Sequence, residues 1–120
     1  MLIRLPYPVP VNRMYRNFNG RMVLSSEGRH WKTQAAMLAT LAGVKLIDAG
    51  GVRISILLHP KKRKDGTASE TRMDLDGALK CALDSLEGVA YVNDKQVVEL
   101  NANIGRPLEG GGLSINVEAA

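Results

Sequence analysis

The chain has 120 residues, of which 45% are hydrophobic and 23% are charged, and it carries a net charge of +4 at pH 7. This length and composition are typical of one folded domain and exclude a disordered chain. The single cysteine excludes an intrachain disulfide and a cysteine-ligated zinc cluster, and it favours a reducing cytoplasm. No apolar run approaches the roughly 20 residues that span a bilayer, and no signal peptide is evident. We therefore expect one cytoplasmic domain over residues 1–120, with no membrane segment.

Basic and acidic residues are separated along the chain. Residues 1–64 hold 12 basic and 2 acidic side chains, whereas residues 65–120 hold 4 basic and 10 acidic ones. This asymmetry favours a protein that binds nucleic acid with one surface and cations with another. The alternative is a surface charge that is uneven but has no function.

The first third of the chain predicts a strand and a hairpin. Residues 2–5 are typical of a short strand, and the prolines within residues 6–10 end it because they cannot take part in a central ladder. The dipeptide Asn19-Gly20 is a strong signal for a type I′ turn. We therefore expect a small hairpin that residues 22–24 complete.

A helix and a second strand follow. Ser25 or Ser26 is suited to cap a helix whose interior covers residues 29–41. Apolar residues at every second position of residues 52–58 predict a strand with one buried face. The helix positions that we expect in the core, from their helical spacing, are Trp31, Ala35, Leu38 and Leu41 with Ala42.

The second half predicts a loop, a helix and two strands. Residues 59–71 show no periodicity and are expected to form a mobile loop. A second helix is predicted from Asp74 to Glu87, with an apolar stripe at Leu75, Leu79, Ala82 and Leu86. Strands are expected over residues 96–104 and 113–117, and the glycines of residues 110–112 suggest a hairpin turn between them. This order of elements predicts an α+β fold in which two helices pack on a small mixed β-sheet.

Two carboxylates stand where the second helix begins. Asp74 and Asp76, when both are ionised, repel each other by roughly 4 kcal/mol at about 4 Å and an effective dielectric constant of 20. A divalent cation removes this repulsion, and Mg²⁺ prefers carboxylate oxygens together with water and phosphate. Lys80 lies one turn after Asp76 on the same face, within reach of the same phosphate. The alternative is that the aspartates cap the helix and that Lys80 makes an ordinary surface pair.

A third carboxylate, Asp94, follows the second helix. If the chain folds back there, Asp94 joins Asp74 and Asp76 in the arrangement that two-metal phosphodiesterases require. The spacing alone does not determine the path of this connection. The alternative is an aspartate that serves a turn.

In order and spacing, these residues resemble the RusA family of Holliday-junction resolvases. The resemblance covers nearly the whole chain, which differs from the family at Gly77, where the family usually has Asn, and at Asn93, where it often has Asp. The residues that carry the resemblance are a Pro-rich first strand, Asn12-Arg13 with Tyr15-Arg16, Ser25 to Gly28, Arg72-Met73-Asp74-Leu75-Asp76, Lys80, Asp84 and the run from Tyr91 to Glu99.

The resemblance implies a homodimeric endonuclease that depends on Mg²⁺, with Mn²⁺ able to substitute, and that resolves four-way DNA junctions by paired symmetric nicks in recombination and repair. It implies no protein partner other than a second copy of the chain. Asp74, Asp76 and Asp94 match the family's metal-binding carboxylates, and Lys80 matches its essential lysine.

The basic residues are the candidates for DNA contact. The run of residues 61–64 lies in the expected loop, where it would touch phosphates without reading sequence. Arginines of residues 13–21 alternate with Tyr15 and Phe18, whose rings are suited to stack on bases at an opened junction. The full set that we assign to DNA binding is Arg13, Arg16, Arg21, Lys61, Lys62, Arg63, Lys64 and Arg72.

Two other functions fit the sequence. The first is a DNA-binding module without catalysis, in which the aspartates are helix caps. The second is a metal-dependent nuclease or phosphatase that acts on other DNA structures or on small substrates. His30 and His59 have no second ligand at a metal-binding spacing, so we expect them to have surface or core roles. Cys81 has no histidine partner or helix N-terminus beside it, so we expect an inert thiol.

Overall fold

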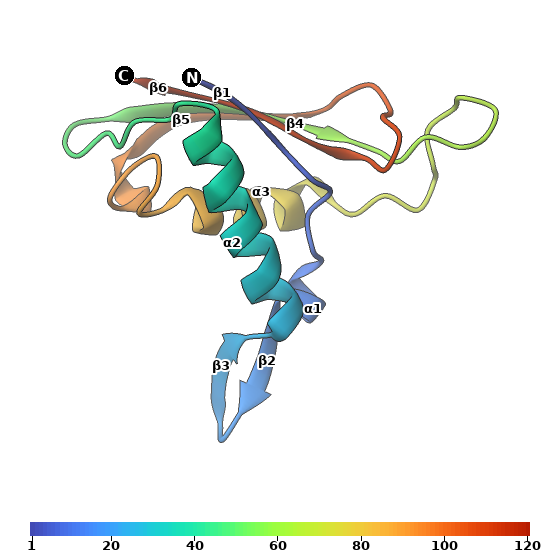
Figure 1. The fold of residues 1–120 in the computed structure, drawn as a ribbon, viewed down its shortest axis with the longest axis horizontal. Helices are drawn as coiled ribbons and strands as arrows, with labels where there is room; N and C mark the ends of the chain where they lie inside the picture. Colours follow the sequence, from blue (N-terminus) through green and yellow to red (C-terminus); the bar gives the residue numbers. More distant parts are fainter.

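A four-stranded mixed sheet carries two long helices on one face, and a separate hairpin projects from this body (Figure 1). The structure is a computed structural model that describes residues 1–120. The expected α+β fold, with two helices on a mixed sheet, is confirmed, and two short helical segments are added to it. The elements are β1 (Leu2–Leu5), α1 (Val11–Met14), β2 (Tyr15–Phe18), β3 (Arg21–Leu24), α2 (Ser26–Leu41), β4 (Val52–His59), α3 (Leu75–Leu86), the 3₁₀ helix η1 (Asp94–Gln96), β5 (Val97–Ile104) and β6 (Gly112–Ala119).

The strand order of the sheet is β1-β6-β4-β5, and only β4 and β5 run parallel. A parallel pair needs a crossover connection, which the segment containing α3 provides. The first strand pairs with the last, with Leu2 opposite Asn116, and the Met1 amino group donates to the Val117 carbonyl at 2.8 Å. Both ends of the chain therefore lie together at one end of the sheet (Figure 1).

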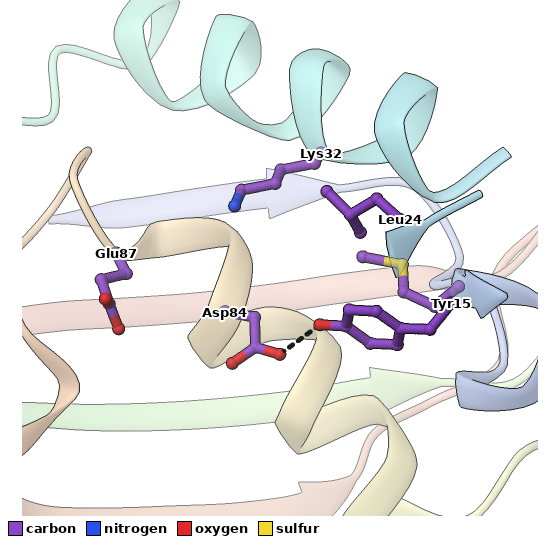
Figure 2. A pocket seen from close by; sticks show the side chains of 6 residues that line it. Tyr15, Leu24, Lys32, Asp84 and Glu87 are labelled. Carbon is purple, nitrogen blue, oxygen red and sulfur yellow. Dashed lines mark hydrogen bonds between the residues drawn. The ribbon is translucent and has the colours of Figure 1, made fainter. Parts of the chain in front are cut away.

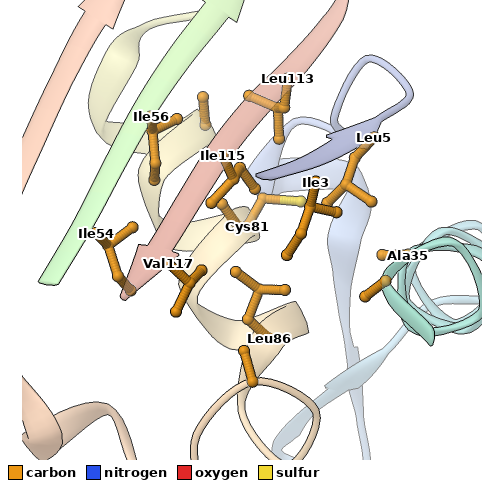
Figure 3. Close-up of a cluster of buried hydrophobic side chains, with 14 of the residues drawn as sticks. Ile3, Leu5, Ala35, Ile54, Ile56, Cys81, Leu86, Leu113, Ile115 and Val117 are labelled. Carbon is orange, nitrogen blue, oxygen red and sulfur yellow. The ribbon is translucent and has the colours of Figure 1, made fainter. Parts of the chain in front are cut away.

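The core lies between the sheet and the helices. In β4, every second residue from Val52 to Leu58 is at most 1% exposed, as its alternation predicts. Figure 3 shows Cys81 and Leu86 of α3 beneath Ile115 and Val117 of β6. The buried residues of α3 are Ala78, Cys81, Ala82, Ser85 and Leu86. The buried face is thus rotated from the predicted stripe, since its small side chains let the helix approach the sheet while Leu75 and Leu79 are only partly buried.

The end of α2 differs from the prediction. Leu41 is 76% exposed rather than in the core, and Ala42 is exposed as well. Gly43 has φ +82°, and the next residue, Val44, donates its N–H to the Ala39 carbonyl. This is the geometry of a Schellman motif, in which the residue after the glycine folds back onto the last helical turn. Val44 therefore packs against the core where Leu41 was expected.

The predicted hairpin is confirmed, as strands β2 and β3 outside the main sheet. Its turn residues Asn19 and Gly20 both have positive φ, 52° and 78°, as a type I′ turn requires. The short helix α1 at the hairpin's base was not predicted. It packs on the first turn of α2, where a Cβ on Gly28 would lie 2.3 Å from the Met14 carbonyl oxygen. Ser25 caps α2 by accepting from the Gly28 N–H, as predicted.

Two connections complete the fold. A loop was expected over residues 59–71, and residues 60–74 form it, except that His59 is the last residue of β4 and is buried, as is Pro60. Backbone hydrogen bonds, such as that from the Lys62 N–H to the Leu108 carbonyl, hold the loop, and its mobility stays a prediction. The glycines of residues 110–112 do not form a hairpin turn, because β5 and β6 lie on opposite sides of β4. They end a connection that crosses past the end of β4. No helix in the structure has the length and apolar character needed to cross a membrane.

Candidate active site

The N-terminal end of α3 presents two exposed carboxylates. Asp74 occupies the N-cap position, yet its side chain makes no capping hydrogen bond with the helix. Asp76 follows in the first turn and is also exposed. The oxygens of Asp74 are therefore not used to cap the helix, which leaves them available to a ligand. Two such carboxylates are the donor set that Mg²⁺ takes together with water and phosphate oxygens, so these residues fit the expected ion.

A cavity of about 450 Å³ lies beside Asp74. Three of the predicted DNA-binding residues meet there, from three different segments: Arg13 from α1, Lys61 from the long loop and Arg72 from the residues before α3. The remaining lining residues are Tyr7, Pro8, Pro10, Val11, Thr71 and Met73. Three cations around a cavity with a carboxylate at its edge are suited to hold a phosphodiester against a metal ion.

Lys80 projects from α3 one turn after Asp76. Its ammonium lies 3.6 Å from the Asp84 carboxylate and 5.9 Å from the centre of the Tyr15 ring. The Lys80 side chain is 56% exposed, so this ion pair contributes little to stability and leaves the ammonium accessible.

Tyr15 is tied to Asp84, which sequence reasoning missed. The Tyr15 hydroxyl donates to the Asp84 carboxylate at 2.6 Å, at the edge of a cavity of about 230 Å³ that Lys32 and Glu87 also line (Figure 2). Burial and this hydrogen bond raise the pKa of Tyr15 to about 12. Tyr15 is therefore a fixed support at the base of the hairpin, whereas Phe18 at its tip remains 50% exposed.

Asp94 lies beyond the other end of α3. The 12 residues of α3 span about 18 Å at 1.5 Å per residue. After the helix, Gly88 turns the chain with φ +84° and donates to the Tyr91 carbonyl, so the connection stays at the C-terminal end. Within one chain, Asp94 therefore does not reach Asp74 and Asp76. No three acidic, histidine or cysteine side chains come together in the structure as a metal-binding group.

The remaining basic residues form two further groups. On the long loop, Lys62, Arg63 and Lys64 line a cavity of about 290 Å³ with Glu109, and Arg63 pairs with Glu70 at 3.2 Å. On the hairpin, the Arg16 guanidinium lies 5.2 Å from the centre of the Phe18 ring. Arg21 is the residue of β3 that lies opposite Phe18 in the strand register.

Of the remaining candidates, His59 and Cys81 are buried, and His30 lies on the surface. His59 is 5% exposed, and its two ring nitrogens meet the Arg106 carbonyl and the Ser114 hydroxyl at 2.8 and 2.7 Å. Burial raises the pKa of the Cys81 thiol to about 11, so the thiol is protonated at neutral pH and is not a nucleophile. His30 is exposed on α2.

Tyr7 is a further residue of the candidate site that sequence reasoning missed. Tyr7 lines the cavity beside Asp74, and its hydroxyl accepts a hydrogen bond from the N–H of Met73, the residue before Asp74. The signal that marks it is a tyrosine between Pro6 and Pro8, in a chain with few aromatic residues.

Comparison with known proteins gives a consistent result. Residues 6–118 match the family model described as "Endodeoxyribonuclease RusA". The crossover junction endodeoxyribonuclease RusA of Escherichia coli strain K12 is 31% identical over 116 residues, which cover 96% of this chain and 91% of the relative. Proteins of the same name from Shigella sonnei and Enterobacteria phage 82 are 30% and 29% identical, with the same coverage.

Proposed function

The chain belongs to the RusA family of endodeoxyribonucleases, and from this premise we propose that it resolves four-way DNA junctions by paired symmetric nicks that depend on Mg²⁺. The observation that carries the proposal is the placement of Asp74, with its carboxylate not used as a cap, at the edge of a cavity lined by three cations. We further propose that the protein acts in the cytoplasm.

Each side chain has a defined role in this proposal. Asp74 and Asp76 hold the metal ion, which when bound polarises the scissile phosphate and lowers the pKa of the attacking water. The cations of the cavity hold the phosphodiester in line for attack. Lys80 compensates the negative charge that develops on the phosphoryl and 3′ oxygens. Cleavage of the bond between phosphorus and the 3′ oxygen leaves a 5′-phosphate and a 3′-hydroxyl.

The position of Asp94 leads to a proposal about assembly. Because α3 separates Asp94 from Asp74 within one chain, a site with all three carboxylates needs Asp94 from a second chain. We propose a two-fold symmetric homodimer in which each chain supplies Asp74 and Asp76 to one site and Asp94 to the other. Such a dimer has two equivalent sites, as the symmetric cutting of two strands of a junction requires.

The test is cleavage of a synthetic four-way junction beside a linear duplex of the same sequence, in Mg²⁺, in Mn²⁺ and in EDTA. We expect symmetric nicks in the junction alone, lost in EDTA. Asp76→Asn should reduce cleavage by at least a hundredfold and leave junction binding intact. The matched control is Glu118→Gln, which removes one exposed negative charge near the C-terminal end of β6. We expect this variant to cleave as the wild type does.

Other outcomes contradict the proposal in distinct ways. Tight junction binding without cleavage in any divalent metal would indicate a DNA-binding module. Equal turnover of linear DNA would indicate a nuclease for other structures. Loss of both cleavage and binding in Asp76→Asn would show that Asp76 has a structural role.

A further inference from the structure

Tyr7 joins three segments of the chain at the edge of the cavity beside Asp74. Its hydroxyl accepts a hydrogen bond of 2.8 Å from the backbone N–H of Met73, 66 residues away in sequence. Its ring faces the Lys61 ammonium, which lies 5.1 Å from the ring centre. Its carbonyl accepts from the Trp31 indole N–H at 2.9 Å. One residue thus contacts the segment before α3, the long loop and helix α2.

Tyr7 is held by one contact on its backbone and another on its ring. Trp31, which is 4% exposed, fixes the backbone of Tyr7 against α2. Gly111 packs directly on the ring, because a Cβ at that position would lie 2.4 Å from the Tyr7 Cδ1 atom. Tyr7 is therefore a fixed point from which the two exposed segments of the cavity are positioned.

The two segments that Tyr7 positions carry the two kinds of charge that the reaction needs. Met73 directly precedes Asp74, so the hydrogen bond to Tyr7 fixes the backbone from which that carboxylate extends. Lys61 is an exposed lysine with a long, flexible side chain, and the cation–π contact restrains its ammonium at the cavity. The separation between a bound phosphate and a bound metal ion depends on the positions of both Lys61 and Asp74.

We propose that Tyr7 is a positioning residue of the nuclease site. It sets the distance between Lys61, which holds a DNA phosphate in the cavity, and Asp74, which holds the metal ion. The inference rests on the proposed nuclease function and adds a residue that touches neither metal nor phosphate. An error of 1 Å in such a placement is sufficient to slow a reaction by a hundredfold.

Two variants separate the two contacts of Tyr7. Tyr7→Phe removes only the hydroxyl, so we expect kcat for junction cleavage to fall about tenfold and the half-saturating Mg²⁺ concentration to rise several-fold. Junction Kd and its salt dependence should stay unchanged, because the ring still faces Lys61. Tyr7→Leu removes the ring as well and should also weaken junction binding. Lys61→Ala should then cost less in Tyr7→Leu than in the wild-type chain, because the two residues are coupled.

The control is Ile54→Val, a core variant in β4 at 0% exposure that lowers stability without touching the cavity. Ile54→Val should leave kcat and the Mg²⁺ requirement unchanged at temperatures where Ile54→Val and Tyr7→Phe are both folded, as judged by circular dichroism. The inference is overturned if Tyr7→Phe retains the wild-type kcat and Mg²⁺ requirement, or if Ile54→Val shows the same losses. If the wild-type chain itself does not cleave junctions, the proposed function fails and this inference fails with it.

Discussion

At the scale of single residues, Tyr15 shows how one hydrogen bond organises the surface around Lys80. The Tyr15 hydroxyl and the Lys80 ammonium both approach the Asp84 carboxylate. Asp84 is therefore shared between a neutral donor and a cation, and it holds both at the junction of the hairpin with α3. Loss of Asp84 would release Lys80 from its place as well as Tyr15.

The raised pKa of Tyr15 predicts a pH dependence of stability. The pKa is raised from 10.0 to about 12, first by burial and then by the hydrogen bond to Asp84. Folding therefore favours the protonated form, and this stabilisation is complete below pH 10 and is lost as the pH rises to about 12. We expect the difference in unfolding free energy between wild type and Tyr15→Phe to be constant up to about pH 10 and to shrink above it. Urea unfolding at several pH values measures this; a difference that does not change up to pH 12 would contradict it.

Residue patterns identified the catalytic candidates but not their supports. The spacing of Asp74, Asp76 and Lys80 along one helix is a local property that the sequence predicts, whereas the partners of Lys80, Asp84 and Tyr15, come from the fold. That the three residues form one catalytic site stays a prediction. The path of Asp94 depends on the turn at Gly88, and the role of Tyr7 depends on a contact across 66 residues. Neither the path of Asp94 nor the role of Tyr7 leaves a periodic pattern in the sequence, so neither could be predicted from it.

At the scale of elements, the hairpin β2–β3 is separate from the four-stranded sheet. Its strands pair only with each other, and it projects away from the sheet (Figure 1). Phe18 and Met22 near its tip are 50% and 68% exposed. With Arg16 stacked on Phe18, the tip combines an aromatic face with positive charge, a combination that is suited to unstacked bases.

Phe18→Ala is therefore expected to affect DNA binding rather than stability. The unfolding free energy should change by no more than about 0.5 kcal/mol, because the side chain is exposed. Loss of base stacking should weaken junction binding by roughly 1–3 kcal/mol and reduce the preference for junctions over duplex. Competition binding measures this, with 2-aminopurine at the junction centre reporting stacking. Leu41→Ala removes a similarly exposed apolar side chain at the far end of α2 and should change neither quantity.

The elements themselves were largely predictable, because helices, strands and the Asn19-Gly20 turn have local signals. The pairing of the strands was not. The glycines of residues 110–112 look like a hairpin turn, yet β4 lies between the strands they connect. Similarly, Leu41 continues the helical period, but the Schellman motif at Gly43 brings Val44 to the core instead.

At the scale of the whole molecule, the proposed dimer makes catalysis a property of two chains. Asp76→Asn and Asp94→Asn homodimers should each be inactive. After the two variants are mixed and allowed to exchange, half of the dimers contain one chain of each kind. Each of these has one intact site and one doubly changed site, so about a quarter of the wild-type sites should return. The product should be a nicked junction rather than two resolved duplexes.

The matched control for this exchange is a mixture of Asp74→Asn with Asp76→Asn. These residues belong to the same half of a site, so no combination of the two chains restores an intact one. Recovered nicking in this control, or none in the first mixture, would contradict a site shared between chains. Activity of the Asp94→Asn homodimer by itself would show that Asp94 is not required.

The pairing of β1 with β6 has a consequence for how the protein is made. At the usual 5–20 residues per second, the ribosome needs roughly 5 to 20 seconds to pass from the first strand to the last. During that time β1 has no partner, and β4 lacks both of its neighbours until β5 is made and lacks β6 until the end. Tyr7 lies just beyond β1, so the support beneath Lys61 and Asp74 is complete only after residues 112–119 have been added. If Tyr7 has the proposed positioning role, a chain still under synthesis is expected to be unable to cut DNA.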